Sequence, residues 1–265
     1  MCALYLVGMG LCGYQDLPLK SYKLLKRCDE IYCEFYTNLV RRDDIKELER
    51  EIGREFFLLN REDIEEKPGD NIFKNSKNSD VCLLVPGDPL AATCHIEVLL
   101  AAQKLGIEVE VFHASSIFSA VGQCGLHLYK FGRATTLVFP EKNYFPQSPY
   151  DVICENQKTG LHTLVLLDVR SDESRYMSIT DALKLLYAIS DKRKSKDKGN
   201  GWEFSGDTLC VGTARLGCQN RFICSGKASD LLDIDFGAPP HTLIIPGKLH
   251  FTEEQALKIY SRENL

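Results

Sequence analysis

One short apolar segment and the turn behind it constrain the fold most. Residues 81–85, Val-Cys-Leu-Leu-Val, have no polar break and are too few for a typical helix, which predicts a buried strand in a sheet covered on both faces. The following Pro86-Gly87-Asp88-Pro89 predicts a sharp turn and a helix whose N-cap is Asp88. Such a turn lies at the carboxyl end of a central strand, where open α/β sheets bind ligands.

The amino terminus repeats this arrangement. Residues 3–7 form a second apolar run, and Gly8-Met9-Gly10-Leu11 follows at once. A lone aspartate after a strand is more often a helix cap than a ligand-binding group. Two strand ends that both open into glycine-containing turns nevertheless predict one ligand lying across the edge of the sheet.

The same glycines also fit a dinucleotide-binding pattern. Residues 8–13 match Gly-x-Gly-x-x-Gly, and Glu34 follows about twenty residues later. That motif requires a helix over residues 14–20, where Pro18 would remove a hydrogen bond and clash with the preceding turn. We therefore expect a longer loop, with Asp16 as a cap and a helix starting near Pro18, and an NAD-dependent oxidoreductase becomes the alternative.

The order of elements predicts the α/β class with two domains, 1–113 and 114–265. In the first half, strands alternate with helices, which favours a mostly parallel sheet. The second half favours a mixed sheet, and residues 192–201, rich in lysine, predict a solvated flexible loop. The expected strands are 3–7, 30–35, 81–85, 109–112, 134–139, 163–169, 208–213, 222–225 and 242–245. The expected helices include 19–26, 43–52, 117–128, 150–156, 179–190, 228–232 and 253–260, with a short helix and a loop within 61–77.

Composition and small motifs exclude several function classes. The net charge of −5 does not favour a nucleic-acid-binding surface, and no apolar run approaches the ~20 residues that span a bilayer. Eleven cysteines without a Cys-x-x-Cys pair give no disulfide framework and no metal site, which predicts a reducing, cytoplasmic compartment. His162 and His241 each precede an apolar strand, where a single histidine is usually structural. No motif for a metal, a nucleoside triphosphate or a serine nucleophile is present.

Several segments, taken together, resemble the diphthine synthase family from residue 1 to about residue 250. The Tyr129-Lys130-Phe131-Gly132 and Pro246–His250 segments are specific to that family, whereas the Gly87-Asp88-Pro89 turn alone indicates only the wider tetrapyrrole-methylase-like superfamily. The other matching segments are residues 8–11, 34–37, 86–90, 116–117, 120–122, 125–132, 160–164, 167–168, 175–177 and 240–241.

The resemblance implies a two-domain, tetrapyrrole-methylase-like homodimer that binds S-adenosylmethionine in the cleft between its domains. It implies a protein substrate, elongation factor 2, on which a histidine carrying a 3-amino-3-carboxypropyl group is methylated to diphthine. No catalytic residue and no metal ligand is implied. The family's cofactor positions fall on Leu11, Asp88, Ala91, Ser116, Ile117, Leu167, Leu216 and His241.

Some features leave the exact reaction open. The segment 171–175 is short, as in archaeal members, which are associated with trimethylation of the amine, whereas eukaryotic members are associated with an added methyl ester. The number of transfers, three or four, therefore stays open. A tetrapyrrole or corrinoid methyltransferase of the same superfamily is a further alternative, although it gives no reason for the Tyr-Lys-Phe-Gly segment at 129–132.

Overall fold

The computed structural model describes residues 2–34, 42–59, 63, 70–171, 173–194 and 202–264. The chain divides into two compact units, which are Met1–Ala120 with Arg170–Glu173, and Val121–Val169 with Ser174–Leu265. The expected domains, 1–113 and 114–265, differ from these units at 114–120 and 170–173 and remain a prediction. The end of the strand expected over 30–35, the 35–37 part of the family segment, most of the helix and loop expected within 61–77, and the 195–201 part of the expected flexible loop lie outside the described residues.

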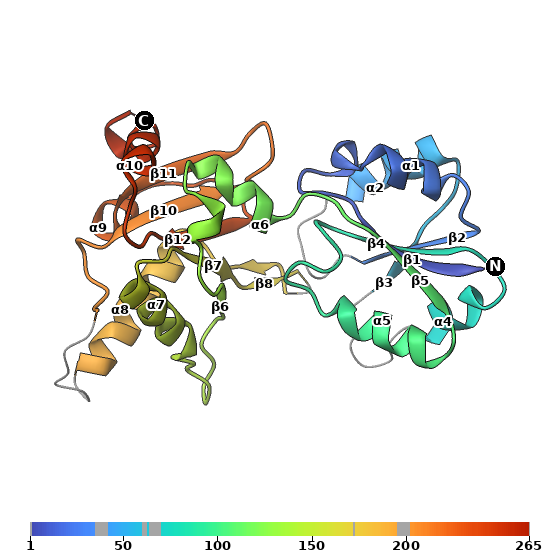
Figure 1. The fold of residues 1–265 in the computed structure, drawn as a ribbon, viewed down its shortest axis with the longest axis horizontal. Helices are drawn as coiled ribbons and strands as arrows, with labels where there is room; N and C mark the ends of the chain where they lie inside the picture. The colour runs from blue at the N-terminus through green and yellow to red at the C-terminus, as the bar shows by residue number, and fades with distance from the viewer. Residues whose placement is uncertain are drawn as a thin grey trace. The chain divides into compact units, whose positions relative to one another are not determined.

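The first unit contains a fully parallel sheet with the strand order β3-β2-β4-β1-β5 (Figure 1). The two apolar runs at residues 3–7 and 81–85 therefore lie in adjacent central strands, β1 and β4, and Gly8 pairs with Val85 at their carboxyl ends. The strands are β1 (Ala3–Gly8), β2 (Glu30–Glu34), β3 (Phe57–Leu59), β4 (Val81–Val85) and β5 (Glu108–Phe112).

Helices cover both faces of this sheet, as the sequence predicts. Figure 1 shows α1 and α2 on one side and α4 and α5 on the other. Alternate residues of β1 enter different cores: Tyr5 and Val7 pack with α1 and α2, whereas Leu4 and Leu6 pack with α4 and α5. The helices are α1 (Leu19–Leu25), α2 (Arg42–Ile52), α4 (Asp70–Ser76) and α5 (His95–Lys104).

The helix after β4 differs from its prediction. It begins at His95 and not at Pro89, because the Asp88 carboxylate bonds to neighbouring loops and Ala92 adopts a left-handed φ of 59°. Its buried residues are His95, Val98 and Ala102, whereas Ile96 and Leu100 are about half exposed. The expected N-cap role of Asp88 is therefore wrong.

The second unit contains a mixed sheet with the order β11-β10-β12-β7-β6. The β6–β7 pair is parallel and the other three pairs are antiparallel, which confirms the predicted mixture. A separate two-stranded sheet joins β8 and β9. The strands are β6 (Thr135–Leu137), β7 (Thr163–Leu167), β8 (Val169–Arg170), β9 (Arg175–Tyr176), β10 (Leu209–Ala214), β11 (Phe222–Lys227) and β12 (His241–Ile245).

One apolar core holds this sheet against α7, α8 and α9. Helix α10 is joined to β11 by two hydrogen bonds instead. The Ser225 amide donates to the Tyr260 carbonyl, and the Ser225 hydroxyl donates to the Leu257 carbonyl. The helix predicted over 117–128 is α-helical only to Ala120 and continues as a 3-10 helix over Val121–Cys124, and the prediction is wrong beyond Cys124, since Gly125 takes a φ of 87° that a helix does not allow. The helices are α6 (Ile117–Ala120), which belongs to the first unit, α7 (Ser148–Thr159), α8 (Ile179–Lys194), α9 (Ala228–Leu231) and α10 (Phe251–Ile259).

Two further expectations concern thiols and membranes. Nine of the eleven cysteines have free thiols, whereas Cys12 and Cys218 are disulfide-bonded, so the expectation of a chain without disulfides is wrong at these two residues. The buried thiols of Cys33, Cys82 and Cys210 have raised pKa values because burial disfavours the thiolate. Within the described ranges, no helix is long and apolar enough to cross a membrane.

Candidate functional site

The loops that follow β1 and β4 are bonded directly to each other. The Gly10 amide donates to the Gly87 carbonyl at 3.1 Å, and the Gly87 amide donates to the Gly10 carbonyl at 2.8 Å. Both glycines have positive φ values, 88° and 74°, which residues with side chains rarely adopt. The two glycine turns singled out in the sequence therefore meet at one point of the sheet edge.

The loop after β5 joins them through Asp88. Its Oδ1 accepts a hydrogen bond from the Leu90 amide at 3.0 Å, and its Oδ2 accepts one from the Ala114 amide at 3.1 Å. Oδ2 also lies 2.9 Å from Nδ1 of His113. Since this carboxylate is only 8% exposed and already accepts from two amides, it is suited to hold loops in place and not to move protons. Sequence reasoning missed the contact with His113, because the two residues are 25 positions apart.

The other predicted cofactor residues of the first unit lie on these same loops. The Ala91 amide donates to the Asp88 carbonyl at 3.2 Å, so Ala91 is part of the turn after β4. Leu11 directly follows Gly10, and a Cβ atom at Gly10 would lie 3.2 Å from the Ser115 hydroxyl. Ser116 and Ile117 come next on the β5 loop, and Ile117 begins α6. The structure thus brings all five to three neighbouring loops of one unit.

In the second unit, Leu167, Leu216 and His241 come together at another sheet edge. Leu167 ends β7 and His241 begins β12, which is antiparallel to β7 and pairs Thr242 with Leu166. On the other side, His241 pairs with Ala214, the last residue of β10, and Leu216 follows two residues later. Because β12 runs opposite to both neighbours, its start lies beside their ends.

His241 is held by backbone groups on both ring nitrogens. Its Nδ1 faces the Ile179 amide at 3.4 Å and its Nε2 faces the Gly237 carbonyl at 3.0 Å, which assigns the proton to Nε2. Burial lowers the pKa of His241, so the neutral ring is favoured. It lines a pocket of about 380 Å³ together with Ser178, Ile179, Thr180, Leu232, Asp233, Ile234, Asp235, Phe236 and Gly237.

Arg215 fixes the loop in front of His241. It has a left-handed φ of 51°, its amide donates to the Pro240 carbonyl at 2.9 Å, and its guanidinium donates to the carbonyls of Phe236 and Ala238. Nothing in the local sequence signals this role, because the Phe236, Ala238 and Pro240 carbonyls are more than twenty residues away.

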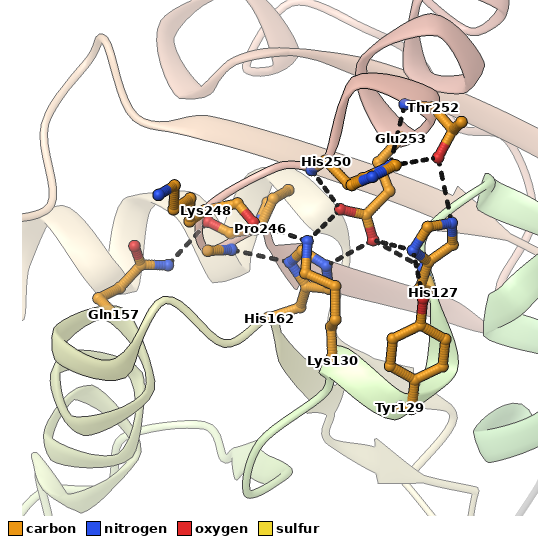
Figure 2. A network of polar contacts seen from close by, with 11 residues as sticks. His127, Tyr129, Lys130, Gln157, His162, Pro246, Lys248, His250, Thr252 and Glu253 are labelled. Carbon is orange, nitrogen blue, oxygen red and sulfur yellow. Dashed lines mark hydrogen bonds and ion pairs between the residues drawn. The ribbon is translucent and has the colours of Figure 1, made fainter.

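A third polar centre lies around Glu253, within the second unit (Figure 2). Its Oε1 accepts from the His127 amide at 2.8 Å and from Nε2 of His162 at 3.0 Å. Its Oε2 accepts from the His250 amide at 2.8 Å and from the Lys130 ammonium. This one carboxylate therefore connects the Tyr-Lys-Phe-Gly segment, the start of β7 and the Pro246–His250 segment, and no local sequence pattern predicts that connection.

The electrostatics of this centre follow from its hydrogen bonds. Burial raises the pKa of Glu253, but bonds from Lys130, from the His250 and His127 amides and from His162 outweigh it and lower the pKa to about 2. Burial lowers the pKa of His162, and its Nδ1 accepts from the Gly247 amide at 2.9 Å, so its proton lies on Nε2. His162 is therefore a structural histidine, as predicted.

Glu34 does not support the dinucleotide alternative. Its carboxylate is fully buried, and Oε2 lies 2.7 Å from Nε2 of His95, which is also fully buried. A ribose-binding acid must be open to the ligand. The helix expected near Pro18 is present as α1, but Asp16 does not cap it, because its carboxylate accepts from the Cys12 amide at 2.9 Å.

The chain matches the family model of the tetrapyrrole (corrin/porphyrin) methylases over residues 3–231. At the level of whole chains, a diphthine synthase of Methanococcus aeolicus is 44% identical over 260 residues, covering 98% of each chain. A diphthine synthase of Methanocaldococcus jannaschii is 44% identical over 264 residues, covering 99% of this chain and 100% of its own. The chain belongs to the diphthine synthase family, and it is a methyltransferase.

Solved structures agree with this assignment. A candidate diphthine synthase from Entamoeba histolytica superposes with a TM-score of 0.88 at 34% identity, covering 98% of this chain and 99% of its own. A second diphthine synthase structure gives a TM-score of 0.85 at 32% identity, covering 98% and 96%. The two-domain α/β fold predicted from the resemblance is therefore confirmed.

Proposed function

We propose that this chain transfers methyl groups from S-adenosylmethionine to the 3-amino-3-carboxypropyl group of a modified histidine on elongation factor 2, which yields diphthine. The observation that carries the proposal is the 44% identity to diphthine synthases over nearly the full length of both chains. The convergence of Gly10, Gly87 and Asp88 at one sheet edge supports a ligand site in the same fold.

Each unit supplies its own set of residues to the donor in this proposal. The first unit contributes Leu11, Asp88, Ala91, Ser116 and Ile117 from the three bonded loops. The second contributes Leu167, Leu216 and His241, and the pocket beside His241, about 380 Å³, has the volume of a small-molecule site. The Asp88 carboxylate on one set of loops fits a donor that carries cationic groups, whereas the pocket beside His241 is lined both by apolar side chains and by the carboxylates of Asp233 and Asp235.

The chemistry requires orientation more than covalent help. The sulfonium group of the donor supplies an activated methyl, and the acceptor amine must approach it in line with its lone pair free. Holding two reactants in that geometry supplies on the order of 7–11 kcal/mol in favourable cases. A free α-amino group titrates near pH ~8, so the neutral amine is accessible without a strong base, and we assign no general base.

The alternatives have less support. A tetrapyrrole or corrinoid substrate fits the wider family model but not the Glu253 centre, which joins the two segments specific to diphthine synthases. The NAD-dependent oxidoreductase alternative requires an exposed acid that binds the ribose, and the Glu34 carboxylate is fully buried. We further propose a homodimer, as the resemblance implies, and a cytoplasmic location, which the nine free thiols support.

Mass spectrometry of the protein substrate tests the proposal. Purified elongation factor 2 that carries the unmethylated intermediate is incubated with enzyme and donor, and we expect successive additions of about 14 Da on the modified histidine, because oriented transfer to one amine can repeat. Three additions indicate trimethylation of the amine, and a fourth indicates an ester on the carboxylate. Matched controls omit the donor or use elongation factor 2 with the unmodified histidine, and both should show no mass change.

The same assay separates the alternatives. Methylation of a porphyrin precursor, with no change on the elongation factor 2 intermediate, would overturn the protein-substrate proposal and favour the tetrapyrrole alternative. Binding of S-adenosylhomocysteine, measured by calorimetry, tests the donor separately from the acceptor. An unmodified chain that does not bind it contradicts the proposed donor.

A further inference from the structure

The turn between β4 and α5 carries Ala91 and has an unfavourable backbone conformation. Ala92 takes a φ of 59°, a region that costs L-residues other than glycine free energy. A turn of this kind keeps its shape only where neighbouring groups fix it. Within this turn, side chains bind the backbone carbonyl of Pro89, so the neighbours of that carbonyl are the contacts that fix the shape of the turn.

Two side chains bind the Pro89 carbonyl from one side of the turn. The Thr93 hydroxyl donates to it at 2.6 Å, and Nδ1 of His95 lies 3.2 Å from it. Thr93 belongs to the turn itself, whereas His95 is the first residue of α5. The His95 ring thus connects the turn to the rigid helix behind it.

The other nitrogen of the same ring is held by Glu34. Nε2 of His95 lies 2.7 Å from Oε2 of Glu34, at the carboxyl end of β2, and both side chains are 0% exposed. Well-packed apolar residues often stabilise a core as much as a buried charged pair does, so stability alone does not account for this pair. The geometry of the pair accounts for it, because Nδ1 of His95 is directed at the Pro89 carbonyl when Nε2 is held by the Glu34 carboxylate.

We propose that Glu34 and His95 are positioning residues of the donor site, which set the shape of the turn and so the place of Ala91. Glu34 orients the imidazole from β2, and the Nδ1–H of His95 donates to the Pro89 carbonyl. The inference rests on the proposed function, because Ala91 was assigned to the donor there. It adds a second layer behind the loops, formed by residues that do not touch the donor.

Two isosteric substitutions of His95 separate its two bonds. In His95→Asn, the amide nitrogen can take the position of Nδ1 and keep the bond to Pro89. In His95→Gln, the amide nitrogen can take the position of Nε2 and keep the bond to residue 34. Both are made together with Glu34→Gln, because a carboxylate without its partner in the core could prevent folding. Glu34→Gln alone is the reference.

Calorimetry with S-adenosylhomocysteine gives the readout, and thermal unfolding reports the stability of each variant. We expect the dissociation constant of Glu34→Gln/His95→Gln to exceed that of the reference by about tenfold or more, because this variant loses the well-placed hydrogen bond to Pro89. We expect the dissociation constant of Glu34→Gln/His95→Asn to stay within about threefold of the reference.

The second unit offers a matched control in His162→Gln, because His162 forms the same buried contact with Glu253 at 3.0 Å. This control should unfold at a lower temperature with unchanged affinity.

The outcomes distinguish this inference from the proposed function. If the unmodified chain does not bind S-adenosylhomocysteine, the proposed function fails, and this inference fails with it. If the unmodified chain binds and the two double variants have equal affinities, whether both lowered or both unchanged, the bond to Pro89 does not position the turn and the inference alone is overturned. An equal loss of affinity in the His162→Gln control would also overturn it, since general destabilisation would then be sufficient.

Discussion

Asp88 and His113 lie 2.9 Å apart, Oδ2 to Nδ1, although they follow two strands that are separated by β1. The contact passes the end of β1 at Gly8, where no side chain intervenes. A Cβ atom built there would lie 2.7 Å from the Gly87 carbonyl oxygen and 2.8 Å from the Ala114 Cβ. The absence of a side chain at Gly8 therefore allows the β4 and β5 loops to meet.

Gly8→Ala should disrupt this junction. The new methyl group meets backbone on one side and a short side chain on the other, so the loops must separate. We expect a loss of about 1–3 kcal/mol in the free energy of unfolding from overpacking. We also expect at least tenfold weaker binding of S-adenosylhomocysteine by calorimetry. Gly226→Ala is the control, because its nearest neighbour would lie 3.7 Å away. Unchanged affinity in a folded Gly8→Ala variant would remove the junction from the donor site.

Asp88→Asn should weaken donor binding more than it weakens the fold. One carboxylate oxygen becomes an NH₂ group, so either the Leu90 amide or the Ala114 amide faces a donor in place of an acceptor. Hydrogen bonds to a charged group contribute about 1.5–3 kcal/mol, so we expect affinity for S-adenosylhomocysteine to fall about 10–100-fold. His113→Ala should have a smaller effect, because that side chain is 64% exposed. Equal affinities of Asp88→Asn and the unmodified chain would contradict the assignment of Asp88.

Ala91→Phe should block the donor and leave the fold intact. Ala91 is partly exposed on the turn after β4, so a larger side chain meets the ligand before it meets the core. We expect no measurable binding of S-adenosylhomocysteine together with a nearly unchanged unfolding temperature. Leu100→Phe is the control on α5, where the native side chain is 48% exposed and is expected to lie away from the donor. A folded Ala91→Phe variant that binds normally would exclude Ala91 from the site.

The central strands were predictable from sequence because their signal is local. The apolar runs of β1 and β4 and the glycines after them fixed both the strands and the edge where their loops meet. The short edge strand β3 was not predicted, because Phe57 and Leu58 are more than half exposed and show no buried pattern.

The start of α5 and the Glu253 centre could not be predicted for a different reason. Asp88 has the residue type of a helix cap, but its acceptor capacity is used by Ala114 and His113 from another loop. Apart from the local hydrogen bond from the His250 amide, Glu253 is hydrogen-bonded to residues 91 to 126 positions earlier. Such long-range pairing leaves no pattern within a sequence window, whereas the family resemblance did indicate which segments matter.

Glu253→Gln should remove an acid-sensitive part of the stability. The pKa of Glu253 is lowered in the folded chain to about 2 from its ordinary value of 4.5, so the unfolded chain binds the proton more readily. The stabilisation is therefore fully present above pH 4.5 and is lost as the pH falls toward about 2. At neutral pH we expect the variant to be less stable by about 2–3 kcal/mol in denaturant unfolding, and this difference should shrink steadily below pH 4.5. Glu254→Gln, at the exposed neighbouring position, should match the unmodified chain at every pH. A stability difference for Glu253→Gln that does not change with pH would show that the carboxylate contributes through packing and not through its charge.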